Sequence, residues 1–371
     1  MSARKYWLGF HVINGIGPVR LQGLARHFGD LELAWRASES DLLAAGLDRR
    51  SLANVLLARQ SINLDKLAAE VEATGASVLT LDDSDYPALL REIPDAPPVL
   101  YFKGTLVEAD RWAVAFVGTR RATVYGRDVT QDLVAGLVNA GITIVSGLAL
   151  GIDAAAHRAA LDSGGRTIAV MGCGIDTIYP PEHRHLAEEI MEHGAVVTEF
   201  PPGTPPEGKN FPVRNRIISG FSLGVVVVEA PASSGALLTA DVAADQGRDV
   251  FAVPGNITSK NSTGANRLIQ QGAKLVMRVE DIMDELNLTA VTVETRTKMR
   301  EIAPVDATEA AVIKFLGTEP LHIDEICRLS GLPIVQLSST LSLMELKGLV
   351  RRVEGMQYTL TRGSGALYRL D

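Results

Sequence analysis

The sequence predicts an α/β protein built on a doubly wound, Rossmann-like parallel sheet, with a helical domain before the sheet and a winged helix after it. Three observations predict this class. The centre of the 371-residue chain alternates short apolar runs with stretches of helical periodicity, the first part shows helical spacing alone, and the last part combines three helical stretches with two short strands. A chain of this length also exceeds one usual hydrophobic core.

We expect a helical domain at residues 1–75, of the SAM or helix-hairpin-helix type. Apolar residues recur there at helical spacing, as in Leu21, Leu24 and Phe28. The segment from Ile13 to Arg20 resembles the hairpin of a helix-hairpin-helix, whose glycines let backbone amides approach a phosphate. A helical turn without a ligand remains the alternative.

Residues 76–288 are expected to form the sheet domain, and the extended stretches at 77–81 and 98–103 to lead into its sheet. Helical segments separate the apolar runs that follow, which is typical of parallel strands with helices on both faces. The predicted central strands are 113–117, 142–146, 167–171, 195–198, 224–229 and 250–253.

Residues 289–304 lose the apolar periodicity and are expected to be a linker. The winged helix is expected at 305–371. Its predicted third helix, 332–347, carries a single lysine at its end, whereas a helix that reads the major groove displays several basic side chains. We therefore expect this domain to serve protein contacts or a weak role in DNA binding.

The net charge of −8 excludes a protein that is basic throughout, since residues 1–100, 101–304 and 305–371 carry −3, −4 and −1. An anion site must therefore be local. Two short segments without acidic residues qualify, although each could be an ordinary solvated run. Their basic residues are Arg120, Arg121 and Arg127 in the first, and Lys209, Arg214 and Arg216 in the second.

Other classes of protein are not indicated. The sequence has neither a signal peptide nor an apolar stretch long enough to span a membrane, so we expect a cytoplasmic protein without membrane contacts. Cys173 and Cys327 lie far apart and form no CxxC motif, which argues against a disulfide framework and a thiolate metal site. We expect no metal and no cofactor.

Glycine-rich polar loops follow the predicted strands, where ligands bind in open parallel sheets. None of them is a dinucleotide fingerprint or a P-loop. They do place several helix N-termini at one crevice, which suits phosphate oxygens, although glycines also serve simply to make tight turns. The loops are 117–126, 146–153, 172–180, 230–239 and 253–257.

Distinct sequence blocks follow one another along the centre of the chain. They are Gly118-Thr-Arg120 with Tyr125-Gly126, Ser146-Gly-Leu-Ala149 with Gly151-Ile-Asp153 and His157, Asn210 to Ser219, Glu229-Ala-Pro with Ser234-Gly235 and Thr239, Val253-Pro-Gly255, and Gly264 to Ala273. Across about residues 85–285, these blocks resemble the signatures of the DprA/Smf family. The resemblance implies a protein that holds and protects single-stranded DNA during natural transformation and recombination. It also implies help in loading RecA recombinase, a homodimer and no catalytic residues.

The strand contacts are expected to include phosphates, met by Arg120, Lys209, Arg214 and Arg216. Phe211, and Tyr125 as a second candidate, would stack on bases. The adjacent Arg121 leaves open which arginine faces the strand, and we favour Arg120.

Asn215, Ser234 and Thr239 could hydrogen-bond base edges or hold the loops. Alternatively, Asn215 and Arg216 brace the sheet internally, with Arg216 paired to Glu229. The full set of predicted site residues is Gly118, Thr119, Arg120, Tyr125, Gly126, Ser146, Gly147, Lys209, Phe211, Arg214, Asn215, Arg216, Ser234, Gly235 and Thr239.

Two rival functions remain. One is a Rossmann-type nucleotide phosphoribohydrolase with Glu229 as acid or base, although residues 254–256 break the Pro-Gly-Gly-x-Gly-Thr loop of those enzymes. The other is a protein–protein adaptor with a vestigial pocket. Asp153 and His157, four apart, could be an acid–base or metal pair, but a helix cap and a buried histidine are the commoner explanation.

Overall fold

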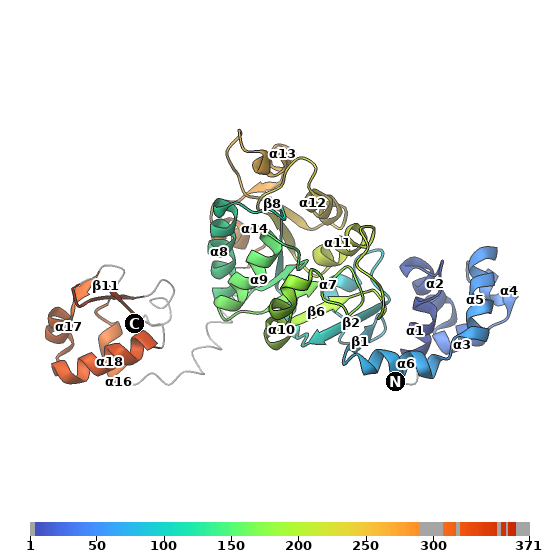
Figure 1. Ribbon diagram of the computed structural model, residues 1–371, viewed down its shortest axis with the longest axis horizontal. Coiled ribbons are helices and arrows are strands. Elements are labelled where there is room, and N and C mark those ends of the chain that lie inside the picture. Colours follow the sequence, from blue (N-terminus) through green and yellow to red (C-terminus); the bar gives the residue numbers. More distant parts are fainter. Residues whose placement is uncertain (1–3, 289–306, 317–319, 347–349, 354, 361–371) are drawn as a thin grey trace. The chain divides into compact units, whose positions relative to one another are not determined.

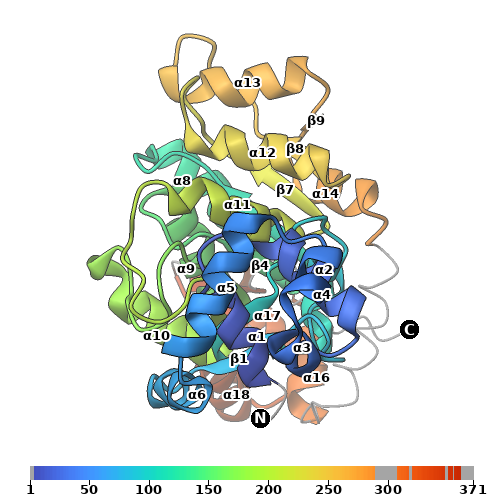
Figure 2. The same ribbon diagram turned by 90° about the vertical axis from the view of Figure 1, so that its right-hand side faces the viewer.

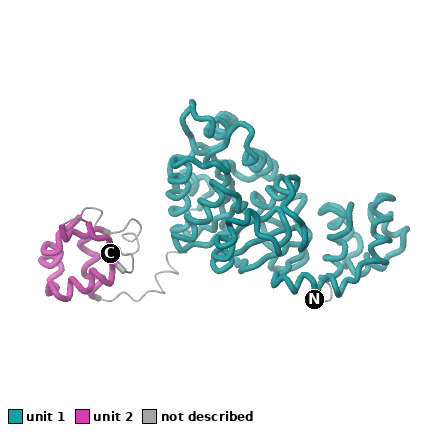
Figure 3. Tube along the Cα trace, viewed as in Figure 1, with its two compact units in different colours: residues 1–288 teal, residues 289–371 magenta. Residues whose placement is uncertain are grey.

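The computed structural model describes residues 4–288, 307–316, 320–346, 350–353 and 355–360. The chain divides into two compact units, residues 1–288 and 289–371 (Figure 3). The expected linker at 289–304 lies outside the described residues. The expected boundary near residue 75 falls inside the first unit and stays a prediction.

Six helices form the N-terminal part of the first unit (Figure 1). Asp30, Ser38, Asp48 and Asn63 precede four of them, and each side chain accepts a hydrogen bond from a backbone amide of the first turn. These caps explain where those helices begin. The six are α1 (Arg4–His11), α2 (Pro18–Phe28), α3 (Leu31–Arg36), α4 (Glu39–Ala44), α5 (Arg49–Ser61) and α6 (Leu64–Ala73).

A nine-stranded sheet follows, in the order β1-β2-β6-β5-β4-β3-β7-β8-β9. The seven strands from β6 to β9 in that order are parallel, as the sequence predicted, whereas β2 pairs antiparallel with β6 and β1 with β2. The sheet is therefore mixed and mostly parallel. Its strands are β1 (Ser77–Thr80), β2 (Val99–Gly104), β3 (Ala113–Val117), β4 (Thr143–Ser146), β5 (Thr167–Val170), β6 (Ala195–Thr198), β7 (Gly224–Val227), β8 (Asp249–Ala252) and β9 (Lys274–Leu275).

Helices cover both faces of the sheet, so strands such as β3 are buried along their whole length. One buried core includes α10 and the N-terminal helices, and another includes α7, α11, α12 and α13. The helices of this region are α7 (Ala88–Arg91), α8 (Val124–Asn139), α9 (Ile152–Asp162), α10 (Arg184–His193), α11 (Asn210–Gly220), α12 (Gly235–Asp245), α13 (Thr263–Gln270) and α14 (Val279–Glu285).

The N-terminal helices share their core with the sheet. Phe10 and Tyr101 belong to the same buried cluster, and the ring of His11 lies 6.0 Å from that of Tyr101. The Nε2 atom of His11 is 2.7 Å from the carbonyl oxygen of Glu199, directly after β6. The first unit is therefore packed continuously from α1 to the sheet.

The strand order changes direction at β3. From β3 the chain passes to β4, β5 and β6 on one side, and then returns to place β7 and β8 on the other side. Loops that leave β3 and β7 at their carboxyl ends therefore diverge and open a crevice, the usual ligand position in a doubly wound sheet.

The second unit has the helices and β-hairpin of a winged helix, with a three-stranded antiparallel sheet. The second helix of this unit begins at Ile323, because Leu321 and His322 pair with β12. The third helix of this unit is α18, on which Val335 is 80% exposed. The lysine at the end of the predicted third helix, Lys347, lies outside the described residues. The elements are α16 (Ala307–Ile313), β10 (Leu321–His322), α17 (Ile323–Ser330), α18 (Ile334–Leu346), β11 (Val350–Val353) and β12 (Gln357–Leu360).

Among the described helices of both units, none is long and apolar enough to cross a membrane.

Candidate nucleic-acid interface

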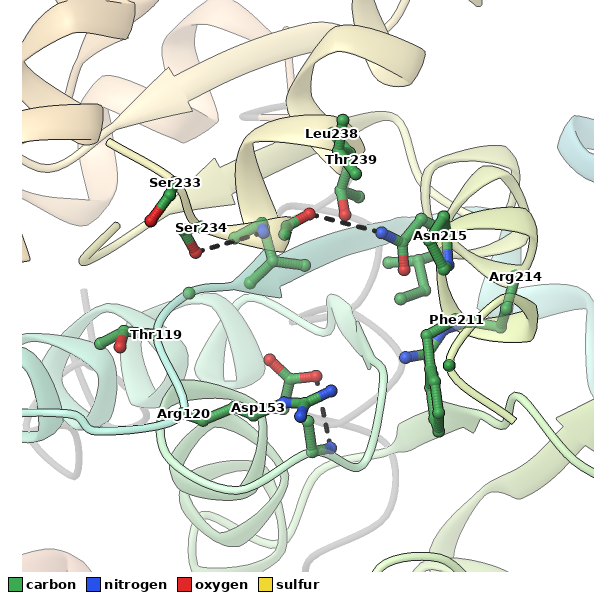
Figure 4. Close-up of a pocket in the computed structure, with 18 of the residues that line it drawn as sticks. Thr119, Arg120, Asp153, Phe211, Arg214, Asn215, Ser233, Ser234, Leu238 and Thr239 are labelled. Atoms are coloured by element: carbon green, nitrogen blue, oxygen red, sulfur yellow. Dashed lines mark hydrogen bonds between the residues drawn. The ribbon is translucent and has the colours of Figure 1, made fainter. Parts of the chain in front are cut away.

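The carboxyl ends of β3, β4 and β7 open into a pocket of about 640 Å³, which we call the switch-point pocket. Figure 4 shows Leu238 and Thr239 on one wall and Arg120 with Asp153 on the opposite one. Nine of the fifteen predicted site residues line the pocket. They are Gly118, Thr119, Arg120, Phe211, Arg214, Asn215, Ser234, Gly235 and Thr239.

Two loops meet backbone to backbone beneath this pocket. Gly151 has a φ of +83°, and a Cβ atom there would lie 2.2 Å from the carbonyl oxygen of Thr119. The amide of Ile152 donates to the same oxygen at 3.2 Å. Only glycine fits this approach, which fixes the loop that carries Arg120.

Arg120 is exposed at the pocket, and its guanidinium makes no ion pair within the described residues. Its Cζ atom lies 5.8 Å from the centre of the Phe211 ring. Arg121 also lines the pocket and is exposed. The pocket therefore combines a cation that can bind phosphate with a half-buried aromatic ring.

Arg214 lies on the buried side of α11, and its guanidinium is only partly satisfied. Its Nη1 atom donates to the carbonyl oxygens of Gly147, at 2.8 Å, and Val170, while its buried Nε atom has no hydrogen-bond partner within the described part of the chain. Burial lowers the pKa of Arg214 to about 10, although the charge of Asp153 counteracts this effect. Arg214 remains a cation at neutral pH and adds positive potential beneath the pocket.

The wall formed by α12 is held by side chains that the sequence singled out. The Ser234 hydroxyl caps α12 by accepting from the amide of Ala236, and Asn215 donates to the carbonyl oxygen of Gly235 at 3.5 Å. Thr239 is buried in the same wall. The N-terminus of α12 therefore faces the pocket, where its dipole favours an anion.

Arg216 lies outside the switch-point pocket. Its guanidinium donates to the Glu199 carboxylate, with one contact of 2.9 Å, and lies 2.9 Å from Asp95. The side chains of Arg216 and Glu199 are each only 8% exposed. The expectations that Arg216 meets a phosphate and pairs with Glu229 are wrong, because this internal network occupies its guanidinium; the alternative that it braces the fold is the one that matches.

Glu229 serves the first turn of α8 instead. Its buried carboxylate accepts from the amide and the hydroxyl of Thr123, at 2.9 and 2.7 Å. A Cβ atom on Gly126 would collide with this carboxylate, and the Tyr125 hydroxyl donates to the carbonyl oxygen of Pro254 at 2.7 Å. Neither Tyr125 nor Gly126 lines the pocket, and Glu229 is not positioned there as the acid or base of a hydrolase.

Three further predicted residues lie around the pocket rather than in it. Lys209 is exposed beside it and pairs with Glu207 at 2.6 Å. The buried Ser146 hydroxyl donates to the carbonyl oxygen of Phe116, and Gly147 lines a smaller pocket of about 50 Å³ next to Arg120. A contact between Lys209 and a bound strand stays a prediction.

Asp153 and His157 have structural partners. The Asp153 carboxylate accepts from the amides of Gly147 and Ala149, and burial raises its pKa. The ring of His157 is fully buried, with Nδ1 2.7 Å from the Thr167 hydroxyl. Within the described part of the chain, no cluster of His, Cys, Asp and Glu could hold a metal ion.

The side chain of Arg20 closes the predicted N-terminal hairpin. Arg20 donates to the carbonyl oxygen of Gly15 at 2.7 Å and pairs with Asp48 at 2.5 Å. Its guanidinium is therefore engaged within the hairpin, and a DNA contact by the backbone amides there stays a prediction.

Sequence reasoning missed several residues that line the pocket. Tyr179 is 38% exposed, and its ring centre lies 5.6 Å from that of Phe211. Leu238, 47% exposed, and Ser233 extend the α12 wall. A tyrosine within the glycine-rich loop 172–180 was the available sequence signal for Tyr179.

The architecture defines a Rossmann-like sheet protein with a cationic, aromatic pocket at its switch point and a C-terminal winged helix. The family model for DNA recombination-mediator protein A matches residues 77–287, and the DprA winged helix domain matches residues 296–356. The chain belongs to the DprA/Smf family, as the sequence blocks indicated.

Relatives match over most of the chain. Protein Smf of Synechocystis sp. is 37% identical across 96% of this chain and 98% of its own length, and DNA processing protein DprA of Bacillus subtilis is 43% identical across 60% and 75%. DprA of Streptococcus pneumoniae has a crystal structure with a TM-score of 0.69 and 36% identity, covering 76% of this chain and 97% of that one. A structure of DNA processing protein A from Helicobacter pylori, described for its single-stranded DNA binding mode, has a TM-score of 0.52 and 30% identity, covering 57% and 95%.

Proposed function

We propose that the switch-point pocket binds single-stranded DNA. The observation that carries this proposal is the pairing of Arg120 with Phe211, 5.8 Å apart, in one pocket at the carboxyl edge of the sheet. Arg120 has no ion pair among the described residues and is free to meet a phosphate. An aromatic ring beside it suits an unpaired base, because base stacking tolerates any sequence.

A single strand fits this arrangement better than a duplex. Phe211 is half-buried and Arg214 lies beneath it, so a base must leave a stack to reach the ring. The bases of a duplex are already stacked and paired, and separating them costs a few kcal/mol. The Helicobacter pylori relative, whose reported binding mode is for single-stranded DNA, supports this choice.

We further propose that the protein acts without catalysis in the cytoplasm, protecting the strand and helping to load RecA recombinase onto it during natural transformation and recombination. We also propose that it works as a homodimer. Family membership and the description of its model as a recombination mediator support this role. Binding of purified RecA to the protein–strand complex, and the mass of the free protein by light scattering, test the two partnerships.

The central experiment measures fluorescence anisotropy of single- and double-stranded oligonucleotides of equal length over about 50–200 mM salt. We expect a preference for single strands. Arg120→Ala should weaken binding about tenfold and lower the slope of log affinity against log salt by about 0.7, the value of one phosphate contact. Phe211→Leu should cost about 1–3 kcal/mol of binding free energy with the salt slope unchanged.

Arg111→Ala is the matched control. Arg111 is an exposed arginine in the turn before β3, at the opposite edge of the sheet, and its loss changes the net charge equally. Equal effects of Arg111→Ala and Arg120→Ala would mean that general charge attracts the strand, and the pocket would lose its role. Ribose release from nucleoside monophosphates would instead favour the hydrolase alternative.

A further inference from the structure

A second pocket, of about 370 Å³, lies between α12 and α13, and we call it the α13 pocket. It shares a wall with the switch-point pocket, formed by Ser233, Ser234, Gly235 and Leu238. Figures 1 and 2 show α13 beyond α12, on the side away from the N-terminal helices. The two pockets are therefore neighbours across the first turn of α12.

The far side of the α13 pocket carries its own polar side chains. Arg267 and Gln271 come from α13 and the residue after it, and Asp241 comes from α12. All three are exposed, and neither Arg267 nor Asp241 forms an ion pair among the residues that the structure describes. Arg267 is thus a second free cation close to the first pocket.

We propose that the α13 pocket binds the next nucleotides of the same single strand, with Arg267 on a phosphate. This inference rests on the proposed function of the switch-point pocket. A strand that leaves the first pocket across Ser233 to Gly235 stays at the N-terminus of α12, where free amides and the helix dipole favour phosphate oxygens. Leu238, 47% exposed on the shared wall, offers apolar surface to a base.

The carboxylate of Asp241 provides a second test of the proposal, because its charge is opposite to that of Arg267. A carboxylate in the same pocket repels a phosphate, so a strand bound there must experience attraction from Arg267 and repulsion from Asp241. Two substitutions therefore have opposite expected effects. Arg267→Ala should weaken binding and Asp241→Asn should strengthen it.

The test measures the affinity of the full chain for homothymidine oligonucleotides of increasing length. The shortest oligonucleotide that responds to Arg120→Ala should ignore both new substitutions. Above a threshold length, Arg267→Ala should weaken binding up to about fivefold and lower the salt slope by about 0.7, while Asp241→Asn tightens binding. Arg111→Ala again serves as the control, and thermal unfolding checks that every variant folds.

Two outcomes would overturn the inference while leaving the first proposal intact. In one, Arg120→Ala weakens binding at all lengths but Arg267→Ala has no effect at any length. In the other, Arg267→Ala changes the mass measured by light scattering and not the affinity for long strands, which would make the α13 pocket an interface between copies. Binding that is insensitive to Arg120→Ala at every length would instead refute the proposed function itself.

Discussion

The buried ion pair between Arg216 and Glu199 is expected to hold α11, and with it the pocket residues Phe211, Arg214 and Asn215, against the sheet. The substitution Glu199→Gln tests this role, because it keeps the size of the side chain and removes its charge. Among the described residues, Asp95, whose side chain is 46% exposed, would then be the one carboxylate left to pair with Arg216. A buried guanidinium would be left with a partner that water screens.

The size of the effect follows from this burial. Breaking a buried pair by removing one partner costs about 3–5 kcal/mol. Because Asp95 remains 2.9 Å from Arg216, we expect the lower end of that range, about 3 kcal/mol. For a unit of residues 1–288 the unfolding entropy is about 0.6 kcal/mol/K, so a loss of about 3 kcal/mol should lower the thermal midpoint of the first unit by about 5 °C.

Thermal unfolding monitored by circular dichroism measures this loss, and Glu285→Gln is the matched control. Glu285 pairs with Lys274 at 2.7 Å on the surface, where the two side chains are 39% and 50% exposed, so its loss should cost less than about 1 kcal/mol. Affinity for single strands, measured well below the midpoint, should fall with Glu199→Gln because α11 loses its anchor. Equal midpoints for the two variants would mean that the pair between Arg216 and Glu199 does not hold α11 against the sheet.

Three further changes have expected results. Burial lowers the pKa of His157 to about 3, against about 6.5 in an unfolded chain. Between these two pH values the unfolded state binds more protons than the folded state. The free energy of unfolding therefore falls as the pH drops through that window, by about 1.4 kcal/mol per pH unit. His157→Gln should make the free energy of unfolding less dependent on pH between about 6.5 and 5, and an unchanged dependence would contradict the assignment. Gly151→Ala should lower the free energy of unfolding by more than about 1–3 kcal/mol and weaken strand binding, because the new Cβ would meet the Thr119 carbonyl. The control is Gly164→Ala, at a position with a similar φ of +71° and open space around it. Similar losses of stability in the two variants would count against the close approach. Leu341→Ala removes a fully buried side chain from the winged helix and should destabilise that unit by about 2–5 kcal/mol. Calorimetry should then show the unfolding transition of the first unit at an unchanged temperature. A shift of both transitions would argue against independent units.

The alternation of apolar runs predicted the parallel part of the sheet, because fully buried strands need apolar residues on both faces. It could not predict how the segments at 77–81 and 98–103 pair. Their antiparallel contacts with each other and with β6 depend on long-range register, which local periodicity does not encode.

The glycine-rich loops after the strands predicted the position of the pocket for a similar reason. The carboxyl ends of parallel strands meet at one edge, so Gly118 to Arg120 and Ser234 to Thr239 had to come together once the strand order was correct. The partner of Arg216 was not predictable in this way. Glu199 and Glu229 both follow a buried strand, and only the path of α11 across the sheet decides which carboxylate it meets.

The shared core of α1 and the sheet has a practical consequence for dissecting this protein. The matched region for the family's central domain starts at residue 77, yet Tyr101 on β2 is 1% exposed in a cluster that includes Phe10 of α1. A fragment cut at that start would present a bare apolar face to solvent and lose the His11 contact to Glu199. Expression of the centre alone should therefore give aggregates unless the exposed face is redesigned with polar side chains, and fragments for crystallisation or labelling should begin before α1.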